Sequence, residues 1–424
     1  MSTSFLITGA RILNPASGAD FEGDVRIEDG FIAEIGTGLS AHEDDIVEAE
    51  GAILSPALID MRARAVEPGG SGPESLDATL RAAASGGVGT LILSPASGSG
   101  IARPEDVDWV AARALTAPVR LLAAGLTHTA SGEMAEAGLM LRAGAAFIGE
   151  GHSQIADMRF LRNLLTYVSA FDAWVALRAE EPSLADGTIA HESSMSVRLG
   201  LPVRPGISER LGVERLAALA ELTGARILLD RISTLDGLEA LKAARRRGLE
   251  IAASVPLTHL VFNEVDMGEL DPAFRLEPPL RSELDRSALL RALAEGVIEA
   301  IVSDHTPLPA DLKANPFSDA PAGSANLEAL IPALCTLDAD GQLPLMAGLK
   351  ALTIGPAELL GLSQGRIEEG APADLILFDP SAPVIYGKEA LQSRAPSAFA
   401  GRRLQGRVLK TWIEGAMVYA HTAE

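Results

Sequence analysis

The sequence predicts an α/β fold of the (β/α)8 TIM-type barrel class, with a small composite β-domain built from the N- and C-terminal segments. Two observations predict it. The central region alternates apolar, strand-like runs with amphipathic stretches that suit helices, and both ends carry short alternating segments typical of half-buried strands. In such a barrel the functional mouth lies at the C-terminal ends of the strands. The apolar runs end near Ile59, Ser94, Thr127, Gly149, Leu177, Leu229, Val255 and Val302.

These patterns divide the chain into three segments. Residues 1–52 and 363–424 are expected to form the β-domain, and residues 53–362 are expected to form the barrel. Asp29-Gly30 is a hairpin signal in the first segment. An open doubly wound sheet is the alternative, but no Gly-x-Gly-x-x-Gly follows the first strand to support it. The clearest amphipathic stretches are 156–169, 209–222, 235–247 and 286–295.

Composition excludes several classes of protein. A hydrophobic content of 47% with 22% charged residues indicates a folded globular chain. The net charge of −22 argues against nucleic acid or an anionic membrane as a partner. Cys335 is the single cysteine, so no disulfide forms within the chain, and no apolar run reaches the length of a membrane span. We therefore expect a cytoplasmic protein.

The stretch from Leu54 to Gly69 holds the first charged cluster. Its apolar part reads as a buried strand that ends in Asp60, Arg62 and Arg64. Side chains two apart in a strand share a face, so these three charges point the same way. Charges at the end of a buried strand are costly unless they are paired. The cluster is therefore either a buried ion-pair group or the floor of an active site.

This stretch resembles the first barrel strand of the dihydroorotase branch of the amidohydrolase superfamily. Pro56, Asp60 and Glu67-Pro68-Gly69 keep the frame of that family's motif. The resemblance continues in the same order over essentially the whole chain. Further matching segments include 144–151, 179–184, 278–281, 303–307 and 370–379.

Several functional positions differ from the family pattern. The resemblance places Glu150 at the position of a metal-bridging residue, and Asp304 at that of a metal ligand that also moves the proton. His305 is kept beside it, whereas the second histidine of that motif has become Leu308. The positions of the four histidine ligands hold Arg62, Arg64, Arg178 and Arg231, and the substrate-binding positions hold Val66, Ala96 and Glu277.

Arginine in place of histidine changes what the mouth can bind. A guanidinium has no lone pair to give and does not lose its proton at ordinary pH, so it cannot be a metal ligand. We therefore expect no zinc and no other cofactor. The arginines are expected to replace the metals as counter-ions for Asp60, Glu150 and Asp304.

The resemblance then implies a non-catalytic role. We expect a catalytically inactive pseudo-dihydroorotase that is not an enzyme, because losing a metal-bound water removes most of the hydroxide supply. Such homologues are structural or regulatory partners of aspartate carbamoyltransferase in pyrimidine biosynthesis. That chain is the expected partner, together with further copies of this one.

Two alternatives remain open from the sequence. Four arginines around one mouth could bind an anion such as phosphate or carbamoyl-aspartate. The carboxylates of Glu180 and Glu277 weaken this idea, because they could absorb the charge internally. The other alternative is a metal-free hydrolase that acts on a cyclic amide with Asp304 and His305.

Overall fold

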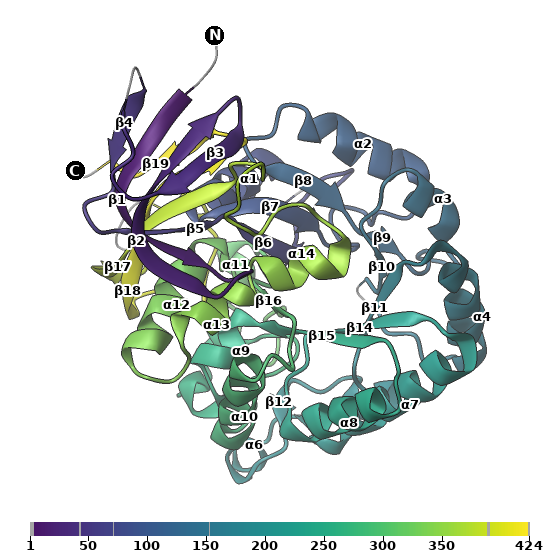
Figure 1. Ribbon diagram of the computed structural model, residues 1–424. Helices are drawn as coiled ribbons and strands as arrows, with labels where there is room; N and C mark the ends of the chain where they lie inside the picture. Colours follow the sequence, from purple (N-terminus) through teal and green to yellow (C-terminus); the bar gives the residue numbers. More distant parts are fainter. Residues whose placement is uncertain (1–3, 42–43, 71, 152, 388–390, 423–424) are drawn as a thin grey trace.

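The computed structural model describes residues 4–41, 44–70, 72–151, 153–387 and 391–422, and it consists of a barrel with a β-sheet domain at one side (Figure 1). Parallel strands form the barrel, and helices surround them. The strands lie in two sheets, ordered β6-β7-β8 and β16-β15-β14-β11-β10-β9. Their bounds are β6 (Leu58–Ala63), β7 (Val88–Leu93), β8 (Arg120–Ala123), β9 (Gly125–Leu126), β10 (Ile148–Gly149), β11 (Trp174–Arg178), β14 (Arg226–Asp230), β15 (Ile251–Pro256) and β16 (Ala300–Val302).

The two sheets close into one barrel. β8 and β9 are parts of one interrupted strand, because only Ala124 separates them. At the other seam, Ala63 bridges His305 in parallel, and the backbone N–H of Arg64 donates to the carbonyl of His305 at 2.8 Å. Counted this way over the described residues, the barrel has eight strands, so the predicted fold class is confirmed.

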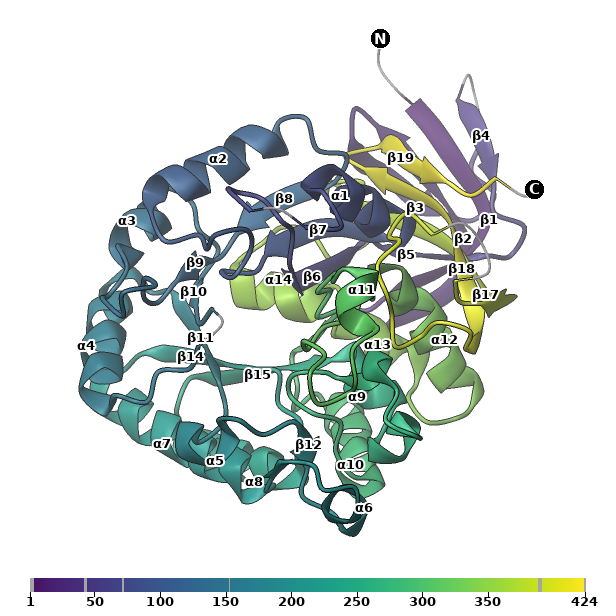
Figure 2. The same cartoon turned by 180° about the vertical axis from the view of Figure 1, so that it is seen from behind.

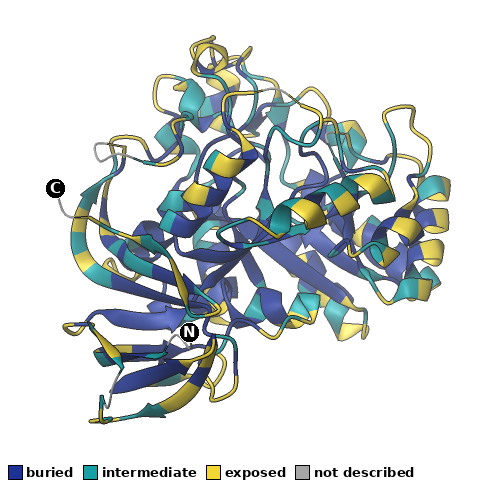
Figure 3. Ribbon diagram, turned by 90° about the horizontal axis from the view of Figure 1, so that it is seen from above, coloured by how far each residue is buried: buried dark blue, intermediate teal, exposed yellow. Residues whose placement is uncertain are grey.

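Helices cover the outside of the barrel, with their exposed faces turned to solvent (Figure 3). The predicted amphipathic stretches correspond to α4, α7, α8 and α10. The helix bounds are α1 (Leu76–Ser85), α2 (Pro104–Ala114), α3 (Ala137–Arg142), α4 (Met158–Val168), α5 (Pro182–Ala185), α6 (Ser194–Arg198), α7 (Ile207–Thr223), α8 (Leu235–Arg246), α9 (Leu257–Val261), α10 (Glu283–Ala294), α11 (Ala310–Lys313), α12 (Leu330–Ala339), α13 (Leu345–Lys350) and α14 (Ile354–Leu360). None of the helices in the described part is long and apolar enough to cross a membrane.

A separate sheet outside the barrel combines strands from the N-terminal and C-terminal segments, which lie on the same side of the molecule (Figure 2). Its order is β19-β18-β17-β5-β1-β2-β3, with β4 paired to β1. Asn14 fixes the junction, because its side-chain amide donates to the carbonyl of Ile367 at 2.8 Å in a buried position. The bounds are β1 (Ser4–Asn14), β2 (Ala19–Glu28), β3 (Phe31–Gly36), β4 (Asp45–Glu48), β5 (Ile53–Pro56), β17 (Leu375–Ile385), β18 (Arg403–Ile413) and β19 (Ala416–Ala420).

An excursion between β11 and β14 reaches toward the barrel mouth. It contains α5, α6 and the short parallel pair β12 (Ala190–His191) and β13 (Val203–Arg204). β13 ends at Arg204, whose side chain is only 3% exposed. The excursion therefore places a buried cation at the mouth, on a segment that is not one of the barrel strands.

Candidate functional site at the barrel mouth

The charged residues that the sequence predicts at the mouth lie at the C-terminal ends of barrel strands. Arg62 lies near the end of β6, Arg178 ends β11, Arg231 follows β14, and Asp304 lies just beyond β16. Arg231 and Asp304 have φ angles of 64° and 48°, in the left-handed region. Such backbone conformations are costly for residues other than glycine, so neighbouring contacts must hold them.

Those contacts form a closed ion-pair group, which we call the mouth quartet: Arg62, Asp230, Arg231 and Asp304. The Arg62 guanidinium donates to Asp304 at 2.8 Å and to Asp230 at 2.9 Å. Arg231 donates to Asp230 at 3.2 Å and to both oxygens of Asp304 at 3.3 Å. Burial would raise the pKa of Asp230, but the nearby arginines, Arg62 first, hold it below its ordinary value. The quartet therefore balances its own charge.

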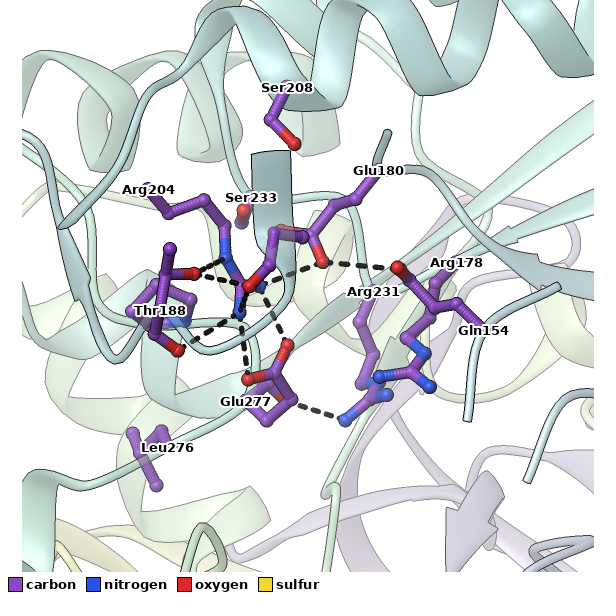
Figure 4. Close-up of polar contacts among 12 residues, drawn as sticks. Gln154, Arg178, Glu180, Thr188, Arg204, Ser208, Arg231, Ser233, Leu276 and Glu277 are labelled. Atoms are coloured by element: carbon purple, nitrogen blue, oxygen red, sulfur yellow. Dashed lines mark hydrogen bonds and ion pairs between the residues drawn. The ribbon is translucent and has the colours of Figure 1, made fainter. Parts of the chain in front are cut away.

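A second group, the Arg204 cluster, consists of Arg204, Glu180, Glu277 and Arg281. Figure 4 shows Arg204 between the carboxylates of Glu180 and Glu277. Arg204 donates to Glu180 and to Glu277, each at 2.7 Å, and Arg281 donates to Glu180 at 3.0 Å. Burial would raise the pKa of Glu277, but Arg204 and the other arginines around it hold that pKa at about 2. Arg231 donates to the backbone carbonyl of Glu277 and so links the two groups.

Glu150 and Arg178 form a looser pair on the next strands. The Glu150 carboxylate accepts from the backbone N–H groups of Ile155 at 2.8 Å and Arg178 at 2.9 Å. The Arg178 side chain lies farther away, with its Nε 3.8 Å from the carboxylate. Burial raises the pKa of Glu150 and lowers that of Arg178, and their mutual attraction opposes both shifts. Arg178 thus acts as the predicted counter-ion, at a greater distance than the arginines of the quartet.

Asp60 differs from the prediction, because no guanidinium pairs with it among the described residues. Its carboxylate accepts from the backbone N–H of Ser303 at 3.0 Å, from the Ser303 hydroxyl, and from the backbone N–H of Arg62 at 3.3 Å. The Arg62 side chain instead reaches past it to the quartet. Burial raises the pKa of Asp60 to about 6. The prediction of arginine counter-ions is therefore right for Asp304 and wrong for Asp60.

His305 does not share a site with Asp304, although the two are adjacent in the chain. Its imidazole is fully buried, with Nε2 2.8 Å from a Glu74 oxygen. Nδ1 accepts from the backbone N–H of Asn326 at 3.1 Å. Both ring nitrogens are thus occupied in the protein interior, while the Asp304 carboxylate lies in the quartet. The predicted hydrolase pair of Asp304 and His305 is not assembled.

The three residues at the predicted substrate-binding positions lie in different surroundings. Glu277 belongs to the Arg204 cluster, and Ala96 is buried. Val66 and Arg64 line a hollow of about 230 Å³ at the rim of the mouth, and Leu308 lies in the same hollow. Only about 10 Å³ remains beneath the quartet, beside Arg62, Glu150 and Asp230, which is room for about one water molecule.

Sequence reasoning missed Asp230, Arg204 and the role of Arg281. A signal existed for Asp230, because a carboxylate that ends an apolar strand run in a barrel points toward the mouth. Arg281 ends the family-like segment 278–281, which by itself indicates no partner for its side chain. Arg204 has no local sequence signal, since it lies in the excursion between β11 and β14 and not at the end of a barrel strand.

The donor set does not fit a metal ion. Within the part of the chain that the structure describes, no group of three or more His, Cys, Asp or Glu side chains is placed to hold one. The carboxylates of the quartet are already paired with guanidinium groups, which cannot act as ligands. Zinc binding sites in proteins use thiolate, imidazole and carboxylate donors that converge on one point.

Zinc is accordingly expected to leave the stability of the protein unchanged. An ion at about 100 times its dissociation constant would add about 2.7 kcal/mol to the free energy of unfolding. We expect melting curves recorded with zinc, with magnesium as the control cation, and with a chelator to superimpose. Stoichiometric zinc in the purified protein, or a lower melting temperature after chelation, would contradict this prediction.

Comparison with known proteins places the chain in a family. Residues 51–236 match the model of the dihydro-orotase-like family, and residues 206–418 match that of the amidohydrolase family. The chain is 33% identical to a dihydroorotase-like protein of Pseudomonas aeruginosa over 97% of this chain and 99% of that one. It is 32% identical to a dihydroorotase of Anaplasma phagocytophilum over 97% of this chain and 94% of that one. The chain therefore belongs to the amidohydrolase family, in its dihydroorotase-like branch.

Solved structures agree on the fold. An L-hydantoinase from Arthrobacter aurescens superposes with a TM-score of 0.86 at 20% identity, covering 98% of this chain and 96% of that one. A D-hydantoinase superposes with a TM-score of 0.84, also at 20% identity, over 98% of this chain and 95% of that one.

These relatives correct one expectation. The prediction that the chain is not an enzyme is wrong, because the relatives that match it nearly end to end include proteins named dihydroorotase. The error has a physical cause. Loss of the histidine donors bears only on a metal-dependent route, and it does not exclude a reaction that needs no metal.

Proposed function

We propose that this dihydroorotase-like barrel works without a bound metal and serves as a structural or regulatory partner of the catalytic chains of aspartate carbamoyltransferase. The observation that supports it most is the mouth quartet, in which Arg62 and Arg231 pair with Asp230 and Asp304. The quartet balances by itself the charge that a metal centre would otherwise balance. The barrel can therefore keep the family's fold, and an outer surface for a partner, with the metal gone.

The relatives support only the family on which the proposal builds. Two proteins of Pseudomonas that match this chain almost end to end are named dihydroorotase-like proteins, at 33% and 32% identity. That name records a likeness to the family, and it names no partner. The proposal concerns what the barrel binds, and it is independent of the reaction that its mouth carries out. A cytoplasmic location and self-association of the chain belong to the same proposal.

Co-purification tests the partnership. The purified chain is mixed with aspartate carbamoyltransferase catalytic chains from the same organism, and the mixture is analysed by size-exclusion chromatography with light scattering. We expect one species heavier than either protein alone, and we expect the chain alone to elute as more than a monomer. A hydantoinase of the same fold is the control and should elute separately. Separate elution of this chain at micromolar concentration, with unchanged carbamoyltransferase activity, would reject the partnership.

The quartet and the Arg204 cluster give little support to the alternative in which the mouth binds an anion. Arg62, Arg231 and Arg204 each donate to carboxylates of the protein itself. An added anion would have to compete with these buried, charge-assisted hydrogen bonds. Arg64 lies outside the quartet and the Arg204 cluster, at the rim of the barrel mouth.

A further inference from the structure

A hollow at the end of the barrel opposite the mouth brings charged and apolar side chains together. It has a volume of about 320 Å³, and we call it the basal hollow. Trp174 and Arg226, which line it, are the first residues of β11 and β14, so it lies at the N-terminal ends of barrel strands. The groups of the mouth lie at the C-terminal ends. The basal hollow is therefore a separate place from the mouth.

Four of the described residues that line the basal hollow are charged, and two of these four already have partners. Arg226 pairs with Glu250 at 3.0 Å, and Glu299 pairs with Arg245 at 2.6 Å. A ligand would have to compete with these ion pairs. Neither Arg226 nor Glu299 is therefore a good candidate for a contact with a charged ligand.

Lys350 and Glu358 are the other two charged residues of the basal hollow. Lys350 ends α13, Glu358 lies in the last turn of α14, and both are exposed. No hydrogen bond or ion pair joins either side chain to another residue within the part of the chain that the structure describes. One hollow thus presents an ammonium group and a carboxylate that are not paired with each other. This arrangement matches a molecule that carries both a carboxylate and an ammonium group.

The floor of the basal hollow is apolar. Leu293, Ile298 and Ala351 line it and are each only 3% exposed, because the surrounding protein covers most of their surface. An apolar group placed against them would lose its contact with water, which favours binding. The volume lies at the lower end of the ~300–1,000 Å³ of small-molecule pockets, so the ligand has to be compact.

The walls of the basal hollow are largely preformed. A Cβ atom at Gly355 would lie 2.1 Å from the carbonyl oxygen of Glu299, so the start of α14 is in direct backbone contact with the residue before β16. The Trp174 indole donates to the carbonyl of Leu359 at 2.7 Å, and the Arg226 guanidinium lies 4.4 Å from the centre of its ring. A preformed pocket spends less binding energy on ordering its own walls.

We propose that the basal hollow binds a small zwitterionic α-amino acid with a branched apolar side chain. The carboxylate of the ligand contacts Lys350, its ammonium group contacts Glu358, and its side chain packs against Leu293 and Ile298. The net charge of −22 opposes the binding of a simple anion, whereas a zwitterion has no net charge to be repelled. This inference does not depend on the partner protein proposed above.

Three probes separate the contributions of the two charges. L-Leucine carries both, 4-methylpentanoate lacks the ammonium group, and 3-methylbutylamine lacks the carboxylate. Tryptophan fluorescence follows binding, because Trp174 lines the hollow. We expect leucine to give a saturable change, with an affinity about fivefold above that of each other probe. No saturable change with leucine at tens of millimolar, or equal affinities for leucine and either other probe, would overturn the proposal.

Variants then locate the site. Lys350→Met and Glu358→Gln change exposed side chains, so folding should tolerate them, and each is expected to weaken leucine binding about fivefold. Lys350→Met should leave the affinity for 3-methylbutylamine unchanged, which distinguishes the loss of one contact from a distortion of the hollow. Glu269→Gln, at an exposed position outside the hollow, is the matched control and should bind leucine as the parent does.

Trp174→Phe tests whether the fluorescence change reports on the basal hollow. Trp109 and Trp412 do not line it, so the change should disappear in this variant. A full fluorescence change in a folded Trp174→Phe protein, or an unchanged leucine affinity in both Lys350→Met and Glu358→Gln, would show that leucine binds elsewhere and would overturn the proposal.

Discussion

Replacing Arg204 with methionine is expected to lower the free energy of unfolding by about 3–5 kcal/mol. The guanidinium is 3% exposed and lies between the carboxylates of Glu180 and Glu277. Methionine fills much of the same space but leaves two negative charges close together and without this cation. Breaking a buried ion pair on one side costs more than the pair contributes, because the remaining charge has lost its solvent as well as its partner. Urea denaturation monitored by circular dichroism measures the change.

An exposed arginine provides the control for that experiment. Arg210 pairs with Glu214 one helical turn away on α7, with both side chains about half exposed. Arg210→Met should lower the free energy of unfolding far less than Arg204→Met, since such surface pairs contribute little. A second variant, Arg204→Met with Glu180→Gln, should recover part of the lost stability because it removes one stranded charge. Equal losses for Arg204→Met and Arg210→Met would show that the cluster contributes no more than a surface pair.

Replacing Asp60 with asparagine is expected to stabilise the protein at pH 7 by up to about 3 kcal/mol, and to have little effect at pH 4. Burial raises the pKa of Asp60 from 3.8 to about 6 in the folded protein. Stability from Asp60 is therefore fully present below about pH 4 and is lost as the pH rises through about 6. Asparagine stays neutral, and its side-chain oxygen can still accept from the backbone N–H groups of Ser303 and Arg62.

The measurement is a series of urea denaturations between pH 4 and pH 7 for the parent and the variant. Asp319→Asn, at an exposed position, is the control for the chemical change itself. His259 acts in the opposite sense, because burial lowers its pKa from 6.5 to about 4 and its contribution is lost on acidification. It acts equally in parent and variant, so it cancels in the difference. A difference between Asp60→Asn and the parent that stays constant with pH would rule out titration of Asp60 in this range.

Whether a site residue could be predicted from the sequence depends on what places it at the mouth. Arg178 and Arg231 could be placed because each ends or follows an apolar run, and barrel geometry carries the end of every strand to one face. His305 could not be separated from Asp304 in this way. The two are neighbours in the sequence, but the backbone at Asp304 is left-handed, with a φ angle of 48°, and the two side chains have different partners.

By itself the sequence determined the barrel, its strand ends and the four arginines at the mouth, because apolar periodicity and residue type are local properties of the chain. Only the tertiary structure decided which carboxylate each arginine meets. Arg62 and Asp304 are paired because closing the barrel brings β6 beside β16, and Arg204 meets Glu180 because an irregular excursion folds back over the mouth. Such partners depend on strand register and loop path. Both are fixed by packing over the whole molecule, and no short stretch of sequence encodes them.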